Sequence, residues 1–148
     1  MRLALDTNVL AYAEGVNGTT NRKAALDLIT RLSDADTFIP VQVLGELFHV
    51  LVRKVGRKPQ HARIAILTWQ DTFPLVETSS NVLLSASDLA TEHHLHIWDS
   101  VVMAAAAASG CRLLLSEDLQ EGFTWGGVTV TNPFAAIKHE LLSVLLGS

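Results

Sequence analysis

The amino-acid sequence predicts an α/β fold in which helices cover both faces of a parallel sheet. Short apolar runs alternate along the chain with longer segments of helical periodicity, a pattern that is typical of this fold class. No repeat, linker or change of composition marks a domain boundary. With 148 residues, of which 49% are hydrophobic and 18% charged, the chain has the size and composition of one globular domain. We expect that domain to span residues 1–148.

Five apolar runs are predicted strands, and they cover residues 2–5, 37–39, 74–76, 112–115 and 128–130. Pro40 ends the second run, because proline cannot donate to a sheet. The apolar pair at residues 97–98 is interpreted as the end of a further strand.

Apolar spacing and helix-end signals predict helices over residues 22–32, 43–55, 59–67, 82–93, 101–108 and about 134–146. Asp6, Thr7 and Asn8 follow the first strand as a turn or a helix cap. Asp99 and Ser100 are expected to cap the helix at 101–108.

The overall charge argues against a simple nucleic-acid binder, since the net charge is −4 and the pI is about 5.8. Five of the 11 basic residues nevertheless lie between residues 53 and 63. This cluster is either the solvated carboxyl end of a helix, where cations favour the helix dipole, or a patch that contacts phosphates. The first interpretation is preferred until other residues indicate an anionic substrate.

Cysteine content and hydropathy bear on the compartment. Cys111 is the single cysteine, which excludes an intramolecular disulfide and suits a reducing environment. The amino terminus reaches the carboxylate of Asp6 too early for a signal peptide. The longest apolar run, residues 101–108, is far shorter than the roughly 20 residues that span a bilayer. We therefore expect a soluble, cytoplasmic protein that does not bind membranes.

Acidic residues are the strongest sign of chemistry. Asp6, Asp99 and Asp118 each lie near the end of a predicted strand, where ligands bind in open α/β sheets. Glu46 lies in an otherwise apolar helical segment. Singly, the three aspartates are best explained as caps or turn residues. Together, the four carboxylates would repel one another and raise one another's pKa values, and a divalent cation would remove that penalty. Oxygen ligands suit Mg²⁺ or Mn²⁺ and not zinc.

Two other features are given structural interpretations. The histidines at 93, 94 and 96 have no cysteine partner and do not have zinc-site spacing, so they are interpreted as a polar connection between helix and strand. Trp98 is predicted to be a core aromatic residue and not a platform for stacking bases.

Four segments resemble, in order, the four sequence blocks of PIN-domain proteins. They are residues 5–10 (LDTNVL), 44–47 (LGEL), 98–105 (WDSVVMAA) and 115–119 (LSEDL). The resemblance is to ribonuclease toxins of the VapC type, and with the closing residues 130–134 (VTNPF) it covers essentially the whole chain. All four blocks in this order, at this chain length, are strongly specific. The resemblance implies a three-layer α/β/α sandwich with a central, mainly parallel sheet.

The resemblance also implies a function. Proteins of this family are divalent-metal-dependent endoribonucleases, usually dimeric, that a cognate antitoxin holds inactive. The chain is therefore expected to cleave RNA with Mg²⁺ or Mn²⁺, to form a homodimer and to bind an antitoxin protein.

Single residues receive roles from the same match. The acidic catalytic and metal-binding positions correspond to Asp6, Glu46, Asp99 and Asp118. The polar positions that support them correspond to Asn8 and Ser116. An RNA substrate makes the basic cluster a more plausible backbone contact, through Arg53, Lys54, Arg57 and Lys58. Glu117 adjoins Asp118, so the residues alone leave open which of them points into the site, and the match to the family block favours Asp118.

Two alternative functions remain open. The first is a non-catalytic PIN-like module that only binds a partner, although such copies usually lose acidic positions. The second is an α/β phosphatase-type hydrolase, which usually has a second aspartate two residues after its nucleophile. Asn8 occupies that place here, which argues against a phosphatase.

Overall fold

The structure is a computed structural model of the chain and describes residues 1–147. In this part of the chain, six strands form one sheet in the order β3-β2-β1-β4-β6-β5. The strands are β1 (Leu3–Leu5), β2 (Thr37–Pro40), β3 (Leu75–Val76), β4 (Leu113–Leu115), β5 (Thr124–Trp125) and β6 (Val128–Thr131). Neighbouring strands are parallel, apart from β5 and β6, which are antiparallel. The predicted α/β class with a mainly parallel sheet is confirmed.

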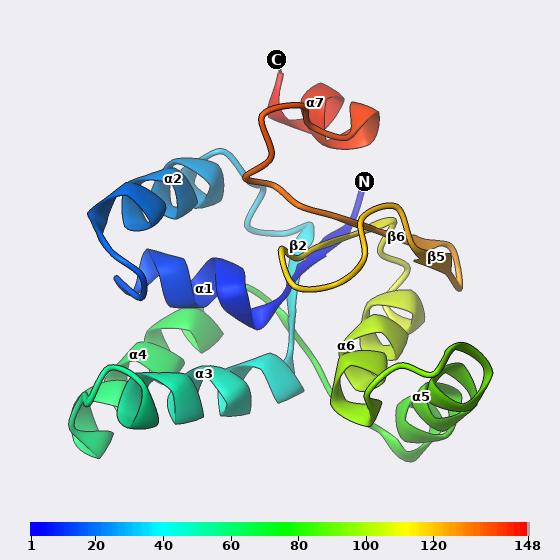
Figure 1. Cartoon of the computed structure of the whole chain (residues 1–148), viewed down its shortest axis with the longest axis horizontal. Coiled ribbons are helices and arrows are strands. Elements are labelled where there is room, and N and C mark those ends of the chain that lie inside the picture. The colour runs from blue at the N-terminus through cyan, green and yellow to red at the C-terminus, as the bar shows by residue number, and fades with distance from the viewer. Residues whose placement is uncertain (148) are drawn as a thin grey trace.

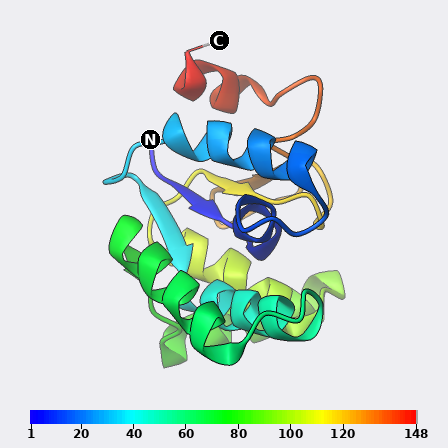
Figure 2. The ribbon, with the colours of Figure 1, turned by 90° about the vertical axis from the view of Figure 1, so that its left-hand side faces the viewer.

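The helices of residues 1–147 are α1 (Thr7–Ala13), α2 (Thr19–Thr30), α3 (Val41–Arg53), α4 (Pro59–Thr72), α5 (Ser80–His93), α6 (Ile97–Ala108) and α7 (Glu140–Leu146). Helices α2 and α7 lie on one side of the sheet, and α3, α4, α5 and α6 lie on the other (Figures 1 and 2). Helix α1 contacts both α2 and α3. These three layers agree with the α/β/α sandwich that the family resemblance implied. Among the described residues, no helix combines the length and apolar character that crossing a membrane requires.

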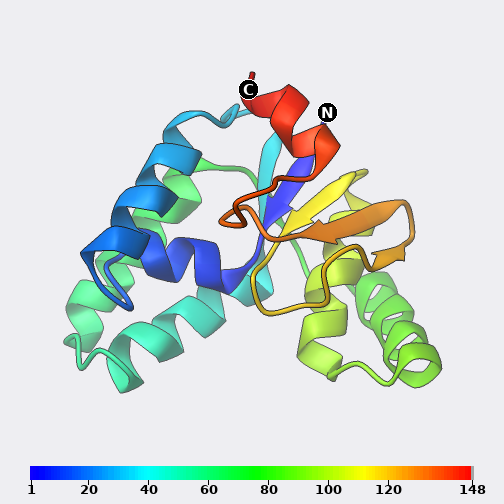
Figure 3. The same cartoon turned by 45° about the horizontal axis from the view of Figure 1, so that its top comes forward.

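The two central strands position the candidate site. Strand β1 lies beside β4 (Figure 3), and every residue of both is buried. Strands that are buried on both faces are continuous apolar runs in the sequence, which is why the leucine-rich segments 3–5 and 113–115 form them. Because the two strands are parallel, their carboxyl ends meet at one edge of the sheet. Asp6 directly follows β1 and Ser116 directly follows β4 at that edge.

The structure corrects the prediction at residues 97–98. These residues are not a strand end but the start of α6, so Asp99 lies in the first turn of that helix. His96 starts the helix, since its ring Nδ1 accepts a hydrogen bond from the Trp98 backbone N–H at 3.3 Å. The His96 carbonyl also accepts from the Ser100 N–H at 3.0 Å. The cap predicted at Asp99 and Ser100 is therefore wrong.

Two further helix assignments differ from the predictions. The last helix begins at Glu140 and not near 134, because the side chain of Asn132 accepts from the Phe134 N–H at 2.9 Å and forms a turn there. Helix α1 was predicted only as a turn or cap. Its residues from Asn8 to Ala13 are all buried, so the helix has no polar face whose periodicity would indicate it.

Candidate active site

Asp6 is the most buried of the four predicted acids, with 6% of its surface exposed. It caps α1: its Oδ1 accepts a hydrogen bond of 2.8 Å from the Thr7 backbone N–H. Its Oδ2 accepts a 2.7 Å hydrogen bond from the hydroxyl of Ser116, which is fully buried. Both oxygens of this carboxylate are thus held at the shared edge of β1 and β4.

Glu46 approaches the same edge from α3. The Thr7 hydroxyl donates to Glu46 Oε2 at 2.6 Å, and the Gln42 side chain donates to Oε1 at 3.2 Å. Thr7 therefore contacts two of the acids, Asp6 through its backbone and Glu46 through its side chain. Neither Thr7 nor Gln42 was predicted as a site residue. Their one signal in the sequence is position, because Thr7 follows Asp6 and Gln42 lies one helical turn before Glu46.

Asn8 links the opposite side of the site. Its side-chain amide donates to Asp118 Oδ2 at 3.3 Å and to the Ser116 hydroxyl at 3.4 Å. Its carbonyl oxygen accepts from the Glu117 backbone N–H at 3.1 Å. The Ser116 hydroxyl in turn accepts from the Asp118 N–H at 3.2 Å. The residues predicted as supporting groups are therefore in contact with Asp6 and Asp118.

The side chains of Glu117 and Asp118 have different partners. The Glu117 carboxylate accepts a hydrogen bond from the Tyr12 hydroxyl, and this contact raises the pKa of Tyr12. Asp118 instead contacts Asn8 and lines an open groove together with Thr7 and Glu46. This geometry favours Asp118 as the fourth acid of the cluster. Tyr12, which holds Glu117 elsewhere, was missed because nothing in the sequence distinguishes it from a core aromatic residue.

Asp99 lies in the first turn of α6 and is half-buried. Burial raises its pKa above the ordinary value, and the negative charges of Glu46 and, more weakly, Asp118 raise it further, whereas His96 acts in the opposite direction. Asp99 is therefore close enough to Glu46 and Asp118 to respond to their charge, although it comes from a different helix.

Burial and neighbouring charge also change the acidity of Asp6. The pKa of this carboxyl is raised from 3.8 to about 6, mainly by burial, while the hydrogen bonds from Ser116 and Thr7 oppose the change. Glu46 and Asp99 raise it further. Within residues 1–147 neither ion pair of the protein involves these acids. The site thus concentrates negative charge, and none of its four acids forms an ion pair within residues 1–147.

Carboxylate oxygens with excess negative charge are suited to a hard divalent cation such as Mg²⁺ or Mn²⁺. Asp6, Glu46, Asp99 and Asp118 fit such an ion in donor chemistry and in charge. In the described part of the chain, no three His, Cys, Asp or Glu side chains form a ready-made coordination cluster. The structure therefore brings the acids to one region without enclosing an ion.

The groove beside the acids continues toward the basic segment. Its next section is lined by Asn8, Tyr12, Lys54 and Asp118, among others. Lys54 is exposed, as are Arg53 and Lys58. A cation therefore lies along the groove next to Asp118, where a polyanion would pass it.

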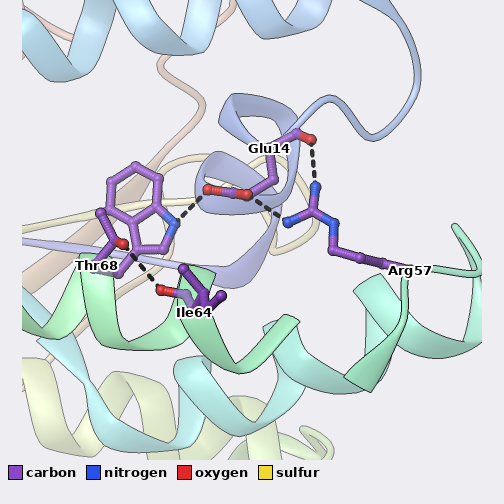
Figure 4. Close-up of polar contacts among 5 residues, drawn as sticks. Glu14, Arg57, Ile64 and Thr68 are labelled. Carbon is purple, nitrogen blue, oxygen red and sulfur yellow. Dashed lines mark hydrogen bonds and ion pairs between the residues drawn. The ribbon is translucent and has the colours of Figure 1, made fainter. Parts of the chain in front are cut away.

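Arg57 is placed differently from the other basic residues. Its guanidinium is directed at Glu14 (Figure 4), with 2.7 Å to the carboxylate and 3.1 Å to the backbone carbonyl. The indole N–H of Trp69 donates to the other Glu14 oxygen at 2.9 Å. This cluster joins the end of α1 to α4. Because the Arg57 guanidinium is paired with Glu14, it does not point into the groove, in contrast to the RNA contact that was predicted for it.

Trp98 differs from its prediction as a core residue. It is 46% exposed, because the helix that starts at His96 turns this side chain away from the sheet. The exposed indole lies one residue before Asp99 in the first turn of α6.

Comparison with known proteins identifies the family. The family model for the PIN domain matches residues 3–121, which include all four acids. No curated protein sequence matches the chain.

Solved structures share the fold. VapC20 from Mycobacterium tuberculosis, a sarcin–ricin loop cleaving toxin, has a TM-score of 0.66 at 16% identity over 78% of this chain and 89% of its own. A toxin–antitoxin complex from Klebsiella pneumoniae has a TM-score of 0.66 at 20% identity, and the match covers 90% of this chain and 98% of the relative's chain. VapBC2 from Rickettsia felis, bound to a DNA fragment from its promoter, has a TM-score of 0.65 at 18% identity, and the match covers 89% of this chain and 98% of the relative's chain. By its sequence match and its fold, this chain belongs to the PIN domain family.

Proposed function

We propose that the chain is a divalent-metal-dependent endoribonuclease and the toxin of a toxin–antitoxin pair. The proposal is supported by the position of Asp6, Glu46, Asp99 and Asp118 in one region near the joined ends of β1 and β4, where none of them forms an ion pair within residues 1–147. The structural relatives, which include a loop-cleaving toxin and toxin–antitoxin complexes, support the same activity.

The chain's own residues would hold the reacting groups in place. Ser116 and the Thr7 N–H fix both oxygens of Asp6, and the Thr7 hydroxyl fixes Glu46. Asn8 holds Asp118. A divalent cation in such a site supplies polarisation of the phosphoryl oxygen and a lower pKa for the attacking water. These hydrogen bonds fix the orientation of Asp6 and Glu46, as supporting groups do for metal-binding carboxylates.

The groove supports a polymeric substrate. It runs from Glu46 and His49 past Asp118 to Lys54, and an open groove accepts an extended chain that an enclosed pocket would exclude. Lys54 would contact a phosphate of the RNA backbone, with Arg53 and Lys58 adding longer-range attraction.

The proposed partners follow from the relatives. Toxin–antitoxin complexes among them support a cognate antitoxin for this chain. A homodimer and the cytoplasm as the compartment remain part of the proposal.

Cleavage of RNA tests the function. Purified protein is incubated with a panel of structured RNAs, including transfer RNAs, in Mg²⁺, in Mn²⁺ or in EDTA. We expect cleavage that requires the metal and is absent from the Asp6→Asn/Asp99→Asn double variant. Asp71→Asn, which changes an exposed aspartate of α4, is the matched control and should cleave like the wild type. Cleavage that persists in EDTA or in the double variant would overturn the proposal.

A further inference from the structure

A separate cavity lies beside Asp99, between the end of α5, α6 and the segment after β4. It has a volume of about 170 Å³. Leu95, Met103 and Leu119 line its apolar part, and His93, Phe123 and Gln120 complete it together with Asp99. Asp99 and Leu119, the neighbour of Asp118, connect this cavity to the acidic cluster. Apart from Asp99, its lining residues have no role in the proposed cleavage chemistry.

We propose that this cavity, here called the Gln120 cavity, binds one unpaired nucleobase of the RNA substrate and so contributes to the choice of cleavage position. The inference rests on the proposed nuclease function, and it names the part of the substrate that the site selects.

The lining matches a flat heterocycle. The rings of His93 and Phe123 meet edge to face, with centroids 5.2 Å apart and planes at 78°, and three aliphatic or thioether side chains line the same cavity. Unpaired bases are recognised by this combination of aromatic and apolar contact with hydrogen bonds to the base edge. The Gln120 amide offers both a donor and an acceptor for such an edge. Gln120 is exposed, and within residues 1–147 no protein hydrogen bond holds its side chain, so its amide can turn toward such an edge.

The charge of the cavity argues against a phosphate. Its lining contains no lysine or arginine, and Asp99 contributes a carboxylate. An anion there would face an uncompensated like charge. A neutral base avoids this cost.

An aromatic side chain of a protein partner is the competing occupant. A phenylalanine or leucine would fill the apolar part but would form no hydrogen bond with the exposed Gln120 amide. A nucleobase satisfies that amide. The observations therefore favour the base.

Methionine methyl NMR tests the inference without any need for cleavage. The sequence has two methionines, Met1 and Met103, and Met103 lies in the cavity wall. Protein labelled with ¹³C at the methionine methyls is titrated in EDTA with adenosine, guanosine, cytidine and uridine in turn. We expect at least one nucleoside to shift the Met103 resonance saturably, while Met1 and a titration with ribose 5-phosphate show no change. No shift with any nucleoside would overturn the inference.

Variants and a second probe sharpen the test. Gln120→Ala should weaken nucleoside binding roughly fivefold, and Phe123→Leu by roughly fivefold or more. Gln70→Ala, at an exposed glutamine of α4, is the matched control and should leave the affinity unchanged. Equal affinities in the Gln120→Ala and Gln70→Ala proteins would overturn the inference. Tighter binding of N-acetylphenylalanine amide than of every nucleoside would also overturn it, in favour of a protein partner.

The cavity and the nuclease function can fail independently. The Asp6→Asn variant, which we expect to lack cleavage, should retain the nucleoside shift at Met103. Metal-dependent cleavage without a nucleoside shift removes only the base-binding inference. A nucleoside shift in a protein that cuts no RNA contradicts the nuclease proposal and leaves the cavity as a base-binding site.

Discussion

The Ser116 hydroxyl donates a 2.7 Å hydrogen bond to Asp6 across 110 positions of sequence. This bond joins the carboxyl ends of β1 and β4, and it links the first and fourth sequence blocks of the family at one point. It also opposes the effect of burial on the pKa of Asp6. The pKa of Asp6 therefore depends on the contact between the two strand ends.

Asp6 should make the metal-free protein less stable as the pH rises. Its pKa is about 6 in the folded protein, against an ordinary value of 3.8, so the folded state binds this proton more tightly than the unfolded state. The contribution of Asp6 to stability is fully present below pH 3.8 and is lost as the pH rises to about 6. The loss amounts to about 3 kcal/mol for two pKa units.

The Asp6→Asn variant tests this pH dependence. In EDTA at pH 7.5, we expect its free energy of unfolding, measured with urea, to exceed that of the wild type, because asparagine carries no charge to bury. The difference should disappear near pH 4. Asp71→Asn should follow the wild-type profile. Parallel profiles of wild type and Asp6→Asn between pH 4 and 7.5 would show that Asp6 does not have the raised pKa.

The adjacent acids after β4 should differ in their effect on cleavage. Asp118→Asn should reduce the cleavage rate by more than the roughly 10–100-fold that is typical of losing a supporting group, because Asp118 faces the groove. Glu117→Gln should change the rate by no more than about threefold, because its carboxylate lies at Tyr12. The measurement is kcat on a single RNA, with circular dichroism as a control for folding. If Glu117→Gln reduced the cleavage rate more than Asp118→Asn, Glu117 and not Asp118 would be the fourth acid of the site.

Lys54 should act on RNA binding and not on folding. It is exposed beside Asp118 in the groove, so Lys54→Ala should raise KM and reduce the salt dependence of binding by roughly 0.7 in the log–log slope, the effect of one lost phosphate contact. Lys23→Ala, at an exposed position of α2, is the matched control. Identical slopes for both variants would exclude Lys54 as a phosphate contact.

Arg57 should instead act on stability. Arg57→Ala leaves the partly buried Glu14 carboxylate with Trp69 as its one remaining side-chain partner among the described residues. We expect a loss of about 1–3 kcal/mol in the free energy of unfolding. Lys58→Ala should change it by less than about 0.5 kcal/mol, as exposed substitutions usually do. If Arg57→Ala instead leaves the free energy of unfolding unchanged and weakens RNA binding, Arg57 is an RNA contact and not a stabilising residue.

Local sequence signals predicted most of the sheet and part of the site. The buried strands are apolar runs, and Asp6, Ser116 and Asp118 follow them within three residues, so their common edge could be inferred. Glu46 was evident as a charge in an apolar helix. The family resemblance then assigned roles that neither spacing nor composition could supply.

The rest depended on tertiary contacts. Asp99 was expected at a strand end, but a histidine cap extended α6 through the apolar pair before it. The ion pair of Arg57 with Glu14 joins positions 43 residues apart, so no local sequence pattern could show that Arg57 differs from the other predicted RNA contacts. Tyr12 and Gln120 carried no signal because each acquires its environment only when distant elements pack together.

Direct binding of Mn²⁺ tests the central claim that four carboxylates form one metal site. Electron paramagnetic resonance measures the free ion during titration of the wild type and of Asp6→Asn, Glu46→Gln, Asp99→Asn and Asp118→Asn, with Asp71→Asn as the control. We predict that the wild type and the control bind Mn²⁺ alike and that each of the four variants weakens binding by at least roughly tenfold. Binding that is unaffected by these four substitutions, or a wild type that binds no Mn²⁺, would contradict the account.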